Sequence, residues 1–210
     1  KFHIKKASEI NKEKLVKFYL NTFQYEKSFA ENYNWRYRTE FSEFEPLVLL
    51  INDEIHGHAG LIPIDINFQD KQRKAIWFTD FYINPKYRSE GYGKLLAQEW
   101  MKICPIRITI CNDQSLNVFK KLGWYNSKKF TRRIKFNNYL KIMPIFRKLN
   151  HFDLVLNHQD NLKLLEINNS TITKLTTLND TQLSKKSICI VRNENWFKWR
   201  LIECPYKKNI

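Results

Sequence analysis

Apolar and polar residues along the chain follow two spacings, one typical of strands and one typical of helices. Residues 2–6 alternate as in a strand, and Asn11 then stands at the N-cap position of a helix expected to reach about Thr22. A second stretch, residues 26–38, also has helical spacing and carries several aromatic side chains. The N-terminal region is therefore predicted to hold one strand followed by two helices.

Extended apolar segments joined by short polar turns fill the middle of the chain. Residues 47–51 and 55–67 flank the turn Asn52-Asp53-Glu54 and predict a β-hairpin. Residues 75–83 follow a second polar turn and add a third strand to this meander. These segments predict the antiparallel part of a sheet.

Beyond residue 85 helices and strands alternate. The expected order is a helix over residues 92–102, a strand over 106–111, a helix over 114–122 and a strand from Trp124. Two strand–loop–helix units in succession imply that part of the sheet is parallel. The predicted fold class is therefore α/β (α+β): a mixed, mostly antiparallel twisted sheet with helices on both faces.

Composition predicts a folded protein. The 210 residues are 43% hydrophobic and 15% aromatic, which excludes intrinsic disorder. The longest uninterrupted apolar stretch, residues 47–51, is far shorter than the roughly 20 residues of a membrane-spanning helix, and residues 1–6 do not resemble a signal peptide. The 4 cysteines form no C-x-x-C pair, so we expect reduced thiols rather than disulfides or a zinc site. We therefore expect a soluble, cytoplasmic protein.

The charge of the chain is strongly basic and uneven. Its 36 basic and 21 acidic residues give a net charge of +15, and ten basic residues but no Asp or Glu lie between Gln114 and His151. Such a field favours an anionic partner: a phosphorylated cofactor, a nucleotide-linked substrate, an acidic membrane surface or nucleic acid. A solvated lysine-rich face without any partner is the alternative.

The clearest chemistry lies between Thr79 and Leu96. A predicted strand ends at Ile83, and an Arg-x-x-Gly-x-Gly turn, residues 88–93, then leads directly into a helix. Backbone N–H groups that no side chain blocks would converge on an anion at that helix N-terminus. The segment has neither the Walker A nor the Rossmann glycine pattern. It therefore predicts a different kind of pyrophosphate-binding turn.

Three motifs in the same order resemble the GNAT superfamily of acyl-CoA-dependent N-acyltransferases. The turn at residues 88–93 is similar to the family's Gln/Arg-x-x-Gly-x-Gly/Ala cofactor motif. NDQSLNVFKKLGW, residues 112–124, is similar to its second signature, and DEIHGH, residues 53–58, to the hairpin that precedes its cofactor strand. The resemblance covers about residues 2–136 and is strongest to bacterial members associated with surface-polysaccharide biosynthesis. Nucleic-acid binding becomes a minor alternative.

The resemblance implies acetyl-CoA (coenzyme A) as cosubstrate and no metal. Backbone amides of the turn would hold the pyrophosphate, and main-chain groups at the end of the preceding strand would pair with the pantetheine arm as an extra strand. Asn112 would reach the same arm, although a plain helix N-cap is an equal reading of this residue. The implied cofactor-binding residues are Phe81, Tyr82, Ile83, Arg88, Ser89, Glu90, Gly91, Tyr92, Gly93, Lys94, Asn112 and Phe119.

Amine acylation also needs a base, or a group that orients the amine, and a proton for the departing thiolate. Asp80, which lies near an acidic position of the family, is expected to be desolvated by aromatic neighbours, with its pKa raised; a purely structural carboxylate is the alternative. His58 is a second candidate base near pH 7. The family's usual acid, a tyrosine, is replaced by Phe119, so transfer proceeds without an acid or uses Tyr125 or Tyr82.

Acceptor specificity in this family comes from the early helices and the hairpin. Tyr33, Trp35 and Arg36 would stack a base or sugar and pair a phosphate, unless these aromatics belong to the core. The predicted function is acetyl transfer to an amine of a small polar acceptor, anionic or nucleotide-linked, such as an amino sugar. The alternatives are a protein or peptide amine acetyltransferase and a non-catalytic acyl-CoA-binding module. A homodimer is left open.

Residues 137–210 exceed what a GNAT-like domain over residues 1–136 requires, and they are predicted as a C-terminal extension. In it Phe197-Lys198-Trp199-Arg200 resembles Tyr33-Asn34-Trp35-Arg36, at a similar distance from a preceding strand. This repeat suggests the start of a second, incomplete GNAT-like lobe that binds no second coenzyme A; coincidence is the alternative. A strand over residues 162–167, a helix over 172–183 and an extended segment over 188–192 are expected there.

Overall fold

The structure is a computed structural model of the chain. It describes residues 1–25, 27–41, 43–68, 71–111, 113–125, 168–182 and 188–205. Contacts group residues 1–110 with 166–210 in one compact unit and residues 111–165 in a second.

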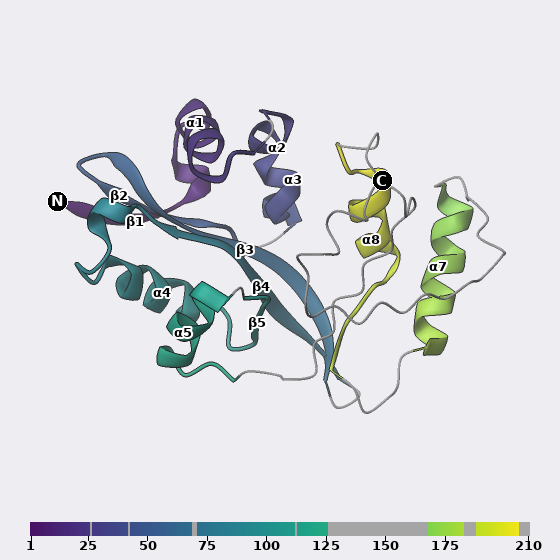
Figure 1. Cartoon of the computed structure of the whole chain (residues 1–210). Helices are drawn as coiled ribbons and strands as arrows, with labels where there is room; N and C mark the ends of the chain where they lie inside the picture. The colour runs from purple at the N-terminus through teal and green to yellow at the C-terminus, as the bar shows by residue number, and fades with distance from the viewer. Residues whose placement is uncertain are drawn as a thin grey trace, which may run out of the picture. The chain divides into compact units, whose positions relative to one another are not determined.

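A mixed sheet forms the centre of the first unit (Figure 1). Its described strands are β1 (Phe2–Lys6), β2 (Leu47–Ile51), β3 (Glu54–Phe68), β4 (Lys71–Ile83), β5 (Arg107–Thr109) and β6 (Cys189–Ile190). They lie in the order β1-β2-β3-β4-β5, with β6 paired to β3. The β4–β5 pair is parallel and the other pairs are antiparallel. The predicted fold class is confirmed.

The β2–β3 hairpin shows how local sequence produces this sheet. All five residues of β2 are apolar and buried. Asn52 and Asp53 then form the turn with positive φ angles of 49° and 64°. Asn and Asp tolerate this left-handed conformation, which two-residue hairpin turns require, better than most residues do. The predicted hairpin is therefore confirmed.

Helices cover the sheet on both faces in Figure 1. Helix α1 (Lys12–Phe23) begins at the predicted N-cap, where the Asn11 side chain accepts a hydrogen bond from the Lys14 N–H. The helix expected over residues 26–38 is instead two short helices, α2 (Lys27–Glu31) and α3 (Tyr33–Tyr37), because Asn32 leaves helical geometry. These three helices pack on one face and α4 (Tyr92–Ile103) on the other.

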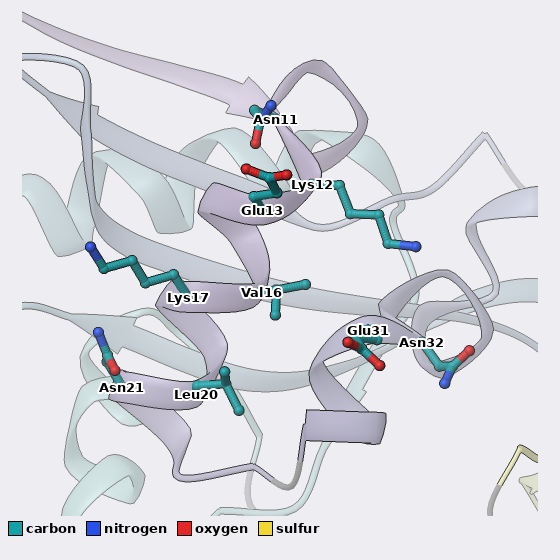
Figure 2. A pocket seen from close by; sticks show the side chains of 9 residues that line it. All are labelled: Asn11, Lys12, Glu13, Val16, Lys17, Leu20, Asn21, Glu31 and Asn32. Atoms are coloured by element: carbon teal, nitrogen blue, oxygen red, sulfur yellow. The ribbon is translucent and has the colours of Figure 1, made fainter.

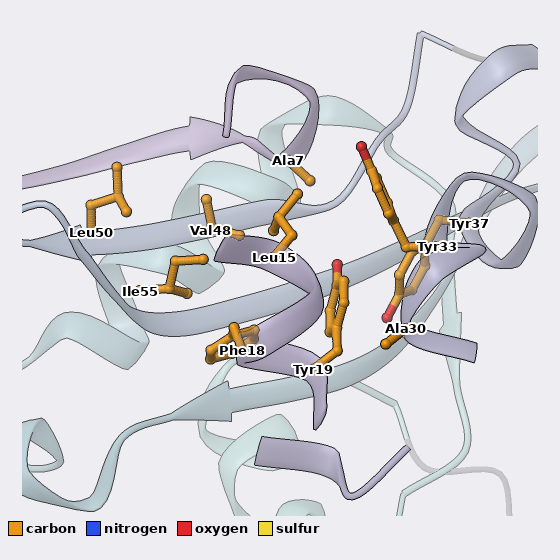
Figure 3. Packing of buried hydrophobic residues seen from close by; sticks show 10 residues of the cluster. All are labelled: Ala7, Leu15, Phe18, Tyr19, Ala30, Tyr33, Tyr37, Val48, Leu50 and Ile55. Carbon is orange, nitrogen blue, oxygen red and sulfur yellow. The ribbon is translucent and has the colours of Figure 1, made fainter. Parts of the chain in front are cut away.

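The core under α1, α2 and α3 is mostly aromatic and aliphatic (Figure 3). Its buried members are Ala7, Leu15, Phe18, Tyr19, Ala30, Tyr33, Tyr37, Val48, Leu50 and Ile55. On the opposite face the rings of Phe78 and Trp100 stack with centroids 4.1 Å apart, which ties α4 to β4. Buried aromatic surface of this kind contributes strongly to the stability of a domain.

A β-bulge interrupts the long β3–β4 ladder. His58 pairs with Tyr82 and Gly60 pairs with Thr79, so two residues of β4, Asp80 and Phe81, face one residue of β3. Asp80 takes up the irregularity with a positive φ of 50°. Bulges redirect side chains and are common next to active sites.

Just beyond the bulge one edge of β4 is open. Strand β5 pairs with β4 only from Ile76 to Phe78. From Thr79 to Ile83 none of the described strands pairs with this side of β4. The backbone N–H and C=O groups of an unpaired edge can bind an extended ligand as an added strand.

The C-terminal part of the first unit adds α7 (Asn169–Gln182), β6, and α8 (Glu194–Phe197), which continues as a π-helical turn, η5 (Lys198–Ile202). Helix α7 overlaps the helix expected over residues 172–183, and β6 lies in the segment expected to be extended. The strand expected over residues 162–167 lies outside the described residues. In the second unit, α5 (Asp113–Lys121) is the helix expected over residues 114–122. No helix in the described part of the chain is long and apolar enough to cross a membrane.

Candidate functional site

Asp80 lies at the centre of a polar cluster formed between the β4 bulge and α3. Its Oδ2 accepts hydrogen bonds from Arg36 Nε at 3.2 Å, from Arg36 Nη2 at 2.9 Å and from the Tyr37 hydroxyl at 2.9 Å. Arg36 Nη2 also donates to the Tyr25 hydroxyl at 2.7 Å. The Asp80 side chain keeps 14% exposure, so a small amine can approach it from solvent.

The ion pair reverses the expected titration of Asp80. Burial alone would raise the pKa of this carboxyl, but the charge of Arg36 and hydrogen bonds from Tyr25 and Arg36 bring the pKa below its ordinary value. The prediction of a raised pKa was therefore wrong, because it counted the aromatic neighbours and not the arginine. Asp80 is ionised at neutral pH. It is a strong hydrogen-bond acceptor and a weak base.

His58 is fully buried directly behind the bulge. Its Nδ1 lies 2.8 Å from the Asp80 carbonyl oxygen and its Nε2 lies 3.1 Å from the Tyr19 hydroxyl. Because a carbonyl only accepts, these partners assign the proton to Nδ1 and make Tyr19 the donor to Nε2. Burial lowers the pKa of His58 to about 4, so the expectation that it titrates near pH 7 was wrong. Its contacts support the bulge.

This histidine predicts how stability depends on pH. An unfolded histidine takes up a proton below about pH 6.5, whereas the folded His58 does so only near its own pKa of about 4. Between these values the unfolded state binds more protons, so stability falls as the pH falls. We expect the free energy of unfolding, measured with urea, to drop by roughly 2 kcal/mol from about pH 7 to about pH 4.5.

A His58→Asn variant tests the source of this loss. Its amide can donate to the Asp80 carbonyl but does not titrate, so we expect it to lose less stability than the wild type over the same interval. His3→Asn, at an exposed position on β1, is the matched control and should behave as the wild type. An unchanged loss in His58→Asn would assign the pH dependence to other groups.

The predicted phosphate-binding turn has the geometry that an anion site needs. The Arg88 Nε atom donates to the Ile83 carbonyl at 3.0 Å, which ties the turn to the end of β4. Ser89 and Gly91 have φ angles of 75° and 85°. Gly91 is the N-cap of α4 and makes no side-chain cap hydrogen bond, and a Cβ at Gly91 would meet no atom within 4 Å. The first N–H groups of a helix have no partner within the helix, so they can bind an anion.

The proposed acceptor residues have different environments. Arg36 contacts Asp80, as described above, and Tyr33 is buried in the core under α1, which agrees with the alternative reading of this aromatic. Trp35 is half-buried and hydrogen-bonds to Trp199. Sequence reasoning missed Tyr25, because aromatic residues are frequent in this chain and nothing local marks its partner. It marked Trp199 only as part of the repeat at residues 197–200 and not as a partner of Trp35.

The candidate acids and the second signature have the following environments within their own units. Tyr82 is half-buried, with its ring 5.9 Å from that of Phe18. In the second unit, Tyr125 is 93% exposed, and Phe119 is buried with its ring 4.9 Å from that of Trp124. Asn112 lies outside the described residues.

Two surface depressions lie elsewhere on the molecule. One, of about 760 Å³, is lined by polar and aliphatic side chains of α1 together with Glu31 and Asn32 (Figure 2). Another, of about 500 Å³, lies where α4 approaches Arg107. Neither is lined by Asp80 or by the turn at residues 88–94. Over the described residues no group of three His, Cys, Asp or Glu side chains is placed to hold a metal ion.

Comparison with known proteins identifies the fold. Residues 12–124 match the model of the acetyltransferase (GNAT) family. No curated protein is similar enough in sequence to count as a match.

Several solved structures share this fold at low sequence identity. An acetyltransferase from Trypanosoma brucei has a TM-score of 0.51 and 18% identity, over 64% of this chain and 100% of that one. A glucosamine-6-phosphate N-acetyltransferase from Arabidopsis thaliana has a TM-score of 0.51 and 15% identity, over 66% of this chain and 99% of that one. A predicted acetyltransferase with acetyl-CoA from Clostridium acetobutylicum has a TM-score of 0.50 and 15% identity, over 67% of this chain and 98% of that one.

Proposed function

The chain belongs to the acetyltransferase (GNAT) family; we propose that it is an acetyl-CoA-dependent N-acetyltransferase whose acceptor is a small polar amine that binds beside Asp80. One observation carries the proposal. The ionised Asp80 carboxylate lies on a bulge that directly precedes the open edge of β4, and that edge leads to the turn at residues 88–94. Donor and acceptor sites would therefore meet at one point of the sheet.

The cosubstrate fits two features of the chain. Strand β5 leaves the Phe81, Tyr82 and Ile83 part of β4 unpaired on its side, and there the pantetheine arm would pair as an added strand. The Glu90 N–H donates to the Arg88 carbonyl at 3.0 Å, so of the segment from Glu90 to Lys94 we propose the N–H groups from Gly91 onward, at the start of α4, for the pyrophosphate. When bound, acetyl-CoA supplies an activated acetyl thioester.

Asp80 would orient the acceptor amine through a hydrogen bond rather than act as the base that takes up the proton of the amine. Its low pKa keeps the carboxylate ionised, so it can accept a hydrogen bond from the attacking amine and hold the nitrogen lone pair toward the thioester. The same low pKa disfavours a lasting transfer of the proton to Asp80, and water at the partly exposed carboxylate would carry it away. Phe119 has no hydroxyl and cannot donate a proton, so the coenzyme A thiolate would leave without a dedicated acid at this position.

The proposed acceptor is an amino sugar, including nucleotide-linked forms. The net charge of +15 favours an acceptor that carries phosphate. Arg38 and Arg200 lie within 5.0 Å of the Trp199 ring, so cationic and aromatic groups gather beside α3. Such a combination suits a sugar or base that carries an anionic group. The resemblance to bacterial polysaccharide-associated enzymes supports the same class.

A panel of amines tests this function. We expect release of free thiol from acetyl-CoA with amino sugars, most strongly with nucleotide-linked ones, together with a mass increase of one acetyl group on the acceptor. Matched sugars that carry a hydroxyl in place of the amine should give only background thiol. Turnover restricted to peptides would overturn the acceptor class, and binding of acetyl-CoA without turnover on any amine would favour a non-catalytic module.

A further inference from the structure

Two similar segments of the chain, one on α3 and one on η5, bind each other through their tryptophans. Trp35 Nε1 donates to the Trp199 carbonyl at 2.9 Å, and Trp199 Nε1 donates to the Trp35 carbonyl at 2.8 Å. Their ring centroids lie 5.8 Å apart. We propose that Trp199 is a positioning residue of the acceptor site, which holds α3 so that Arg36 and Tyr37 stay on Asp80. This inference rests on the proposed function of Asp80.

Helix α3 is too short to be stable by itself. It has five residues, and isolated helices shorter than about 12 residues are marginal in water. The chain leaves helical geometry on both sides of it, at Asn32 with φ −103° and ψ 35° and at Arg38 with a left-handed φ of 54°. The orientation of α3 therefore depends on its tertiary contacts.

One face of α3 is fixed by the sheet. Tyr37 is fully buried, and a Cβ atom on Gly60 of β3 would lie only 2.7 Å from its ring. This close approach sets the distance between the helix and the sheet. Tyr33, at the other end of the helix, is buried in the core under α1. Both contacts lie on one side of the helix, and Trp35 stands between them in the sequence.

Trp199 supplies a further contact, at Trp35 in the middle of the helix. The Trp35 carbonyl accepts the Arg38 N–H at 3.2 Å as well as the Trp199 indole. Trp35, Arg36 and Tyr37 are consecutive, and the last two make the three hydrogen bonds to Asp80 Oδ2. A rotation of the backbone at Trp35 would therefore move both donors away from the carboxylate.

Trp199 is itself firmly placed. It is only 5% exposed, and the guanidinium groups of Arg38 and Arg200 lie 4.7 Å and 5.0 Å from its ring centroid. It belongs to the π-helical turn η5, where Glu203 N donates to the Lys198 carbonyl at 2.9 Å. Short π-helical segments are rare in proteins, and those that occur often lie at functional sites. The family model ends at residue 124, so this residue lies outside the part of the chain that the model matches.

The two similar segments therefore contact each other through Trp35 and Trp199. The C-terminal segment, residues 197–200, would hold α3 and so complete the acceptor site around Asp80. Trp199 acts through Trp35 and α3, and not by touching the acceptor.

The test uses the full chain and two substitutions. Trp199→Phe removes the indole N–H but keeps an aromatic ring, and Trp199→Ala removes both. We expect kcat/KM for the amine acceptor to fall about two- to tenfold in Trp199→Phe and further in Trp199→Ala, because one hydrogen bond to α3 is lost. The KM for acetyl-CoA should stay at its wild-type value. Trp196→Phe, on the same segment and with its ring 6.3 Å from that of Trp199, is the matched control and should change neither constant.

A double-mutant cycle separates this inference from the proposed function. If Trp199 acts through Arg36 and Asp80, Trp199→Phe should have little further effect in the Asp80→Asn background. Additive effects, an unchanged kcat/KM in Trp199→Phe, or an equal rise in the KM for acetyl-CoA would each overturn the positioning role. An Asp80→Asn enzyme with wild-type turnover would instead overturn the proposed function. If Trp199→Ala does not fold, Trp199→Phe decides the question.

Discussion

Asp80→Asn is expected to lower turnover by about a hundredfold or more, with little change in the affinity for acetyl-CoA. Asparagine keeps the shape of the side chain and tolerates the positive φ of 50° at this position, so the bulge should be retained. What it loses is the charge that would orient the acceptor amine. Steady-state kinetics with the best amine of the panel and calorimetry with acetyl-CoA measure the two quantities.

Arg36, the mostly buried ion-pair partner of Asp80, makes a control variant necessary. Asp80→Asn leaves the Arg36 guanidinium without its carboxylate, and breaking a buried ion pair on one side commonly destabilises a protein by about 3–5 kcal/mol. The double variant Asp80→Asn with Arg36→Gln removes both charges and should recover part of that stability but not the turnover. If folded Asp80→Asn keeps more than about a third of wild-type turnover, Asp80 has no part in the transfer step.

Gly91→Asp is expected to weaken acetyl-CoA binding at least tenfold. The new carboxylate would lie at the N-terminus of α4, where the pyrophosphate is proposed to bind, and loss of one or two charge-assisted hydrogen bonds costs roughly 1.5–3 kcal/mol each. A Cβ at this position meets no atom within 4 Å, so the cost of the substitution apart from its charge is the backbone strain of a side chain at a φ of 85°. Isothermal titration with acetyl-CoA measures the effect.

Gly91→Asn is the matched control for this variant. Asparagine has the same shape as aspartate and a similar tolerance of the φ of 85°, but it carries no charge. We expect it to bind acetyl-CoA much more tightly than Gly91→Asp does. Equal losses in the two variants would point to backbone strain rather than charge. Wild-type affinity in a folded Gly91→Asp protein would show that the pyrophosphate binds elsewhere.

The sequence by itself was enough for most features that neighbouring residues encode, although it missed the break at Asn32 between α2 and α3. Apolar spacing predicted β1, the β2–β3 hairpin and the parallel β4–β5 pair, and Asn11 marked the start of α1. These signals are local because hydrogen bonds within a helix, a cap or a tight turn join residues a few positions apart. The order of motifs around residues 53–124 was likewise sufficient to identify the family, which the family match confirms.

Tertiary structure decided the chemistry of the candidate site. Asp80 meets Arg36 across 44 positions of sequence, and Trp35 meets Trp199 across 164. The sign of the Asp80 pKa shift depends on these distant partners, since burial raises the pKa and the arginine charge lowers it. The residues next to Asp80 in the sequence indicate its burial but not its pairing with Arg36, so a prediction from them alone raises the pKa, whereas the folded protein lowers it. A local pattern can show where a carboxylate stands, but its charge is set by groups that only folding brings within reach.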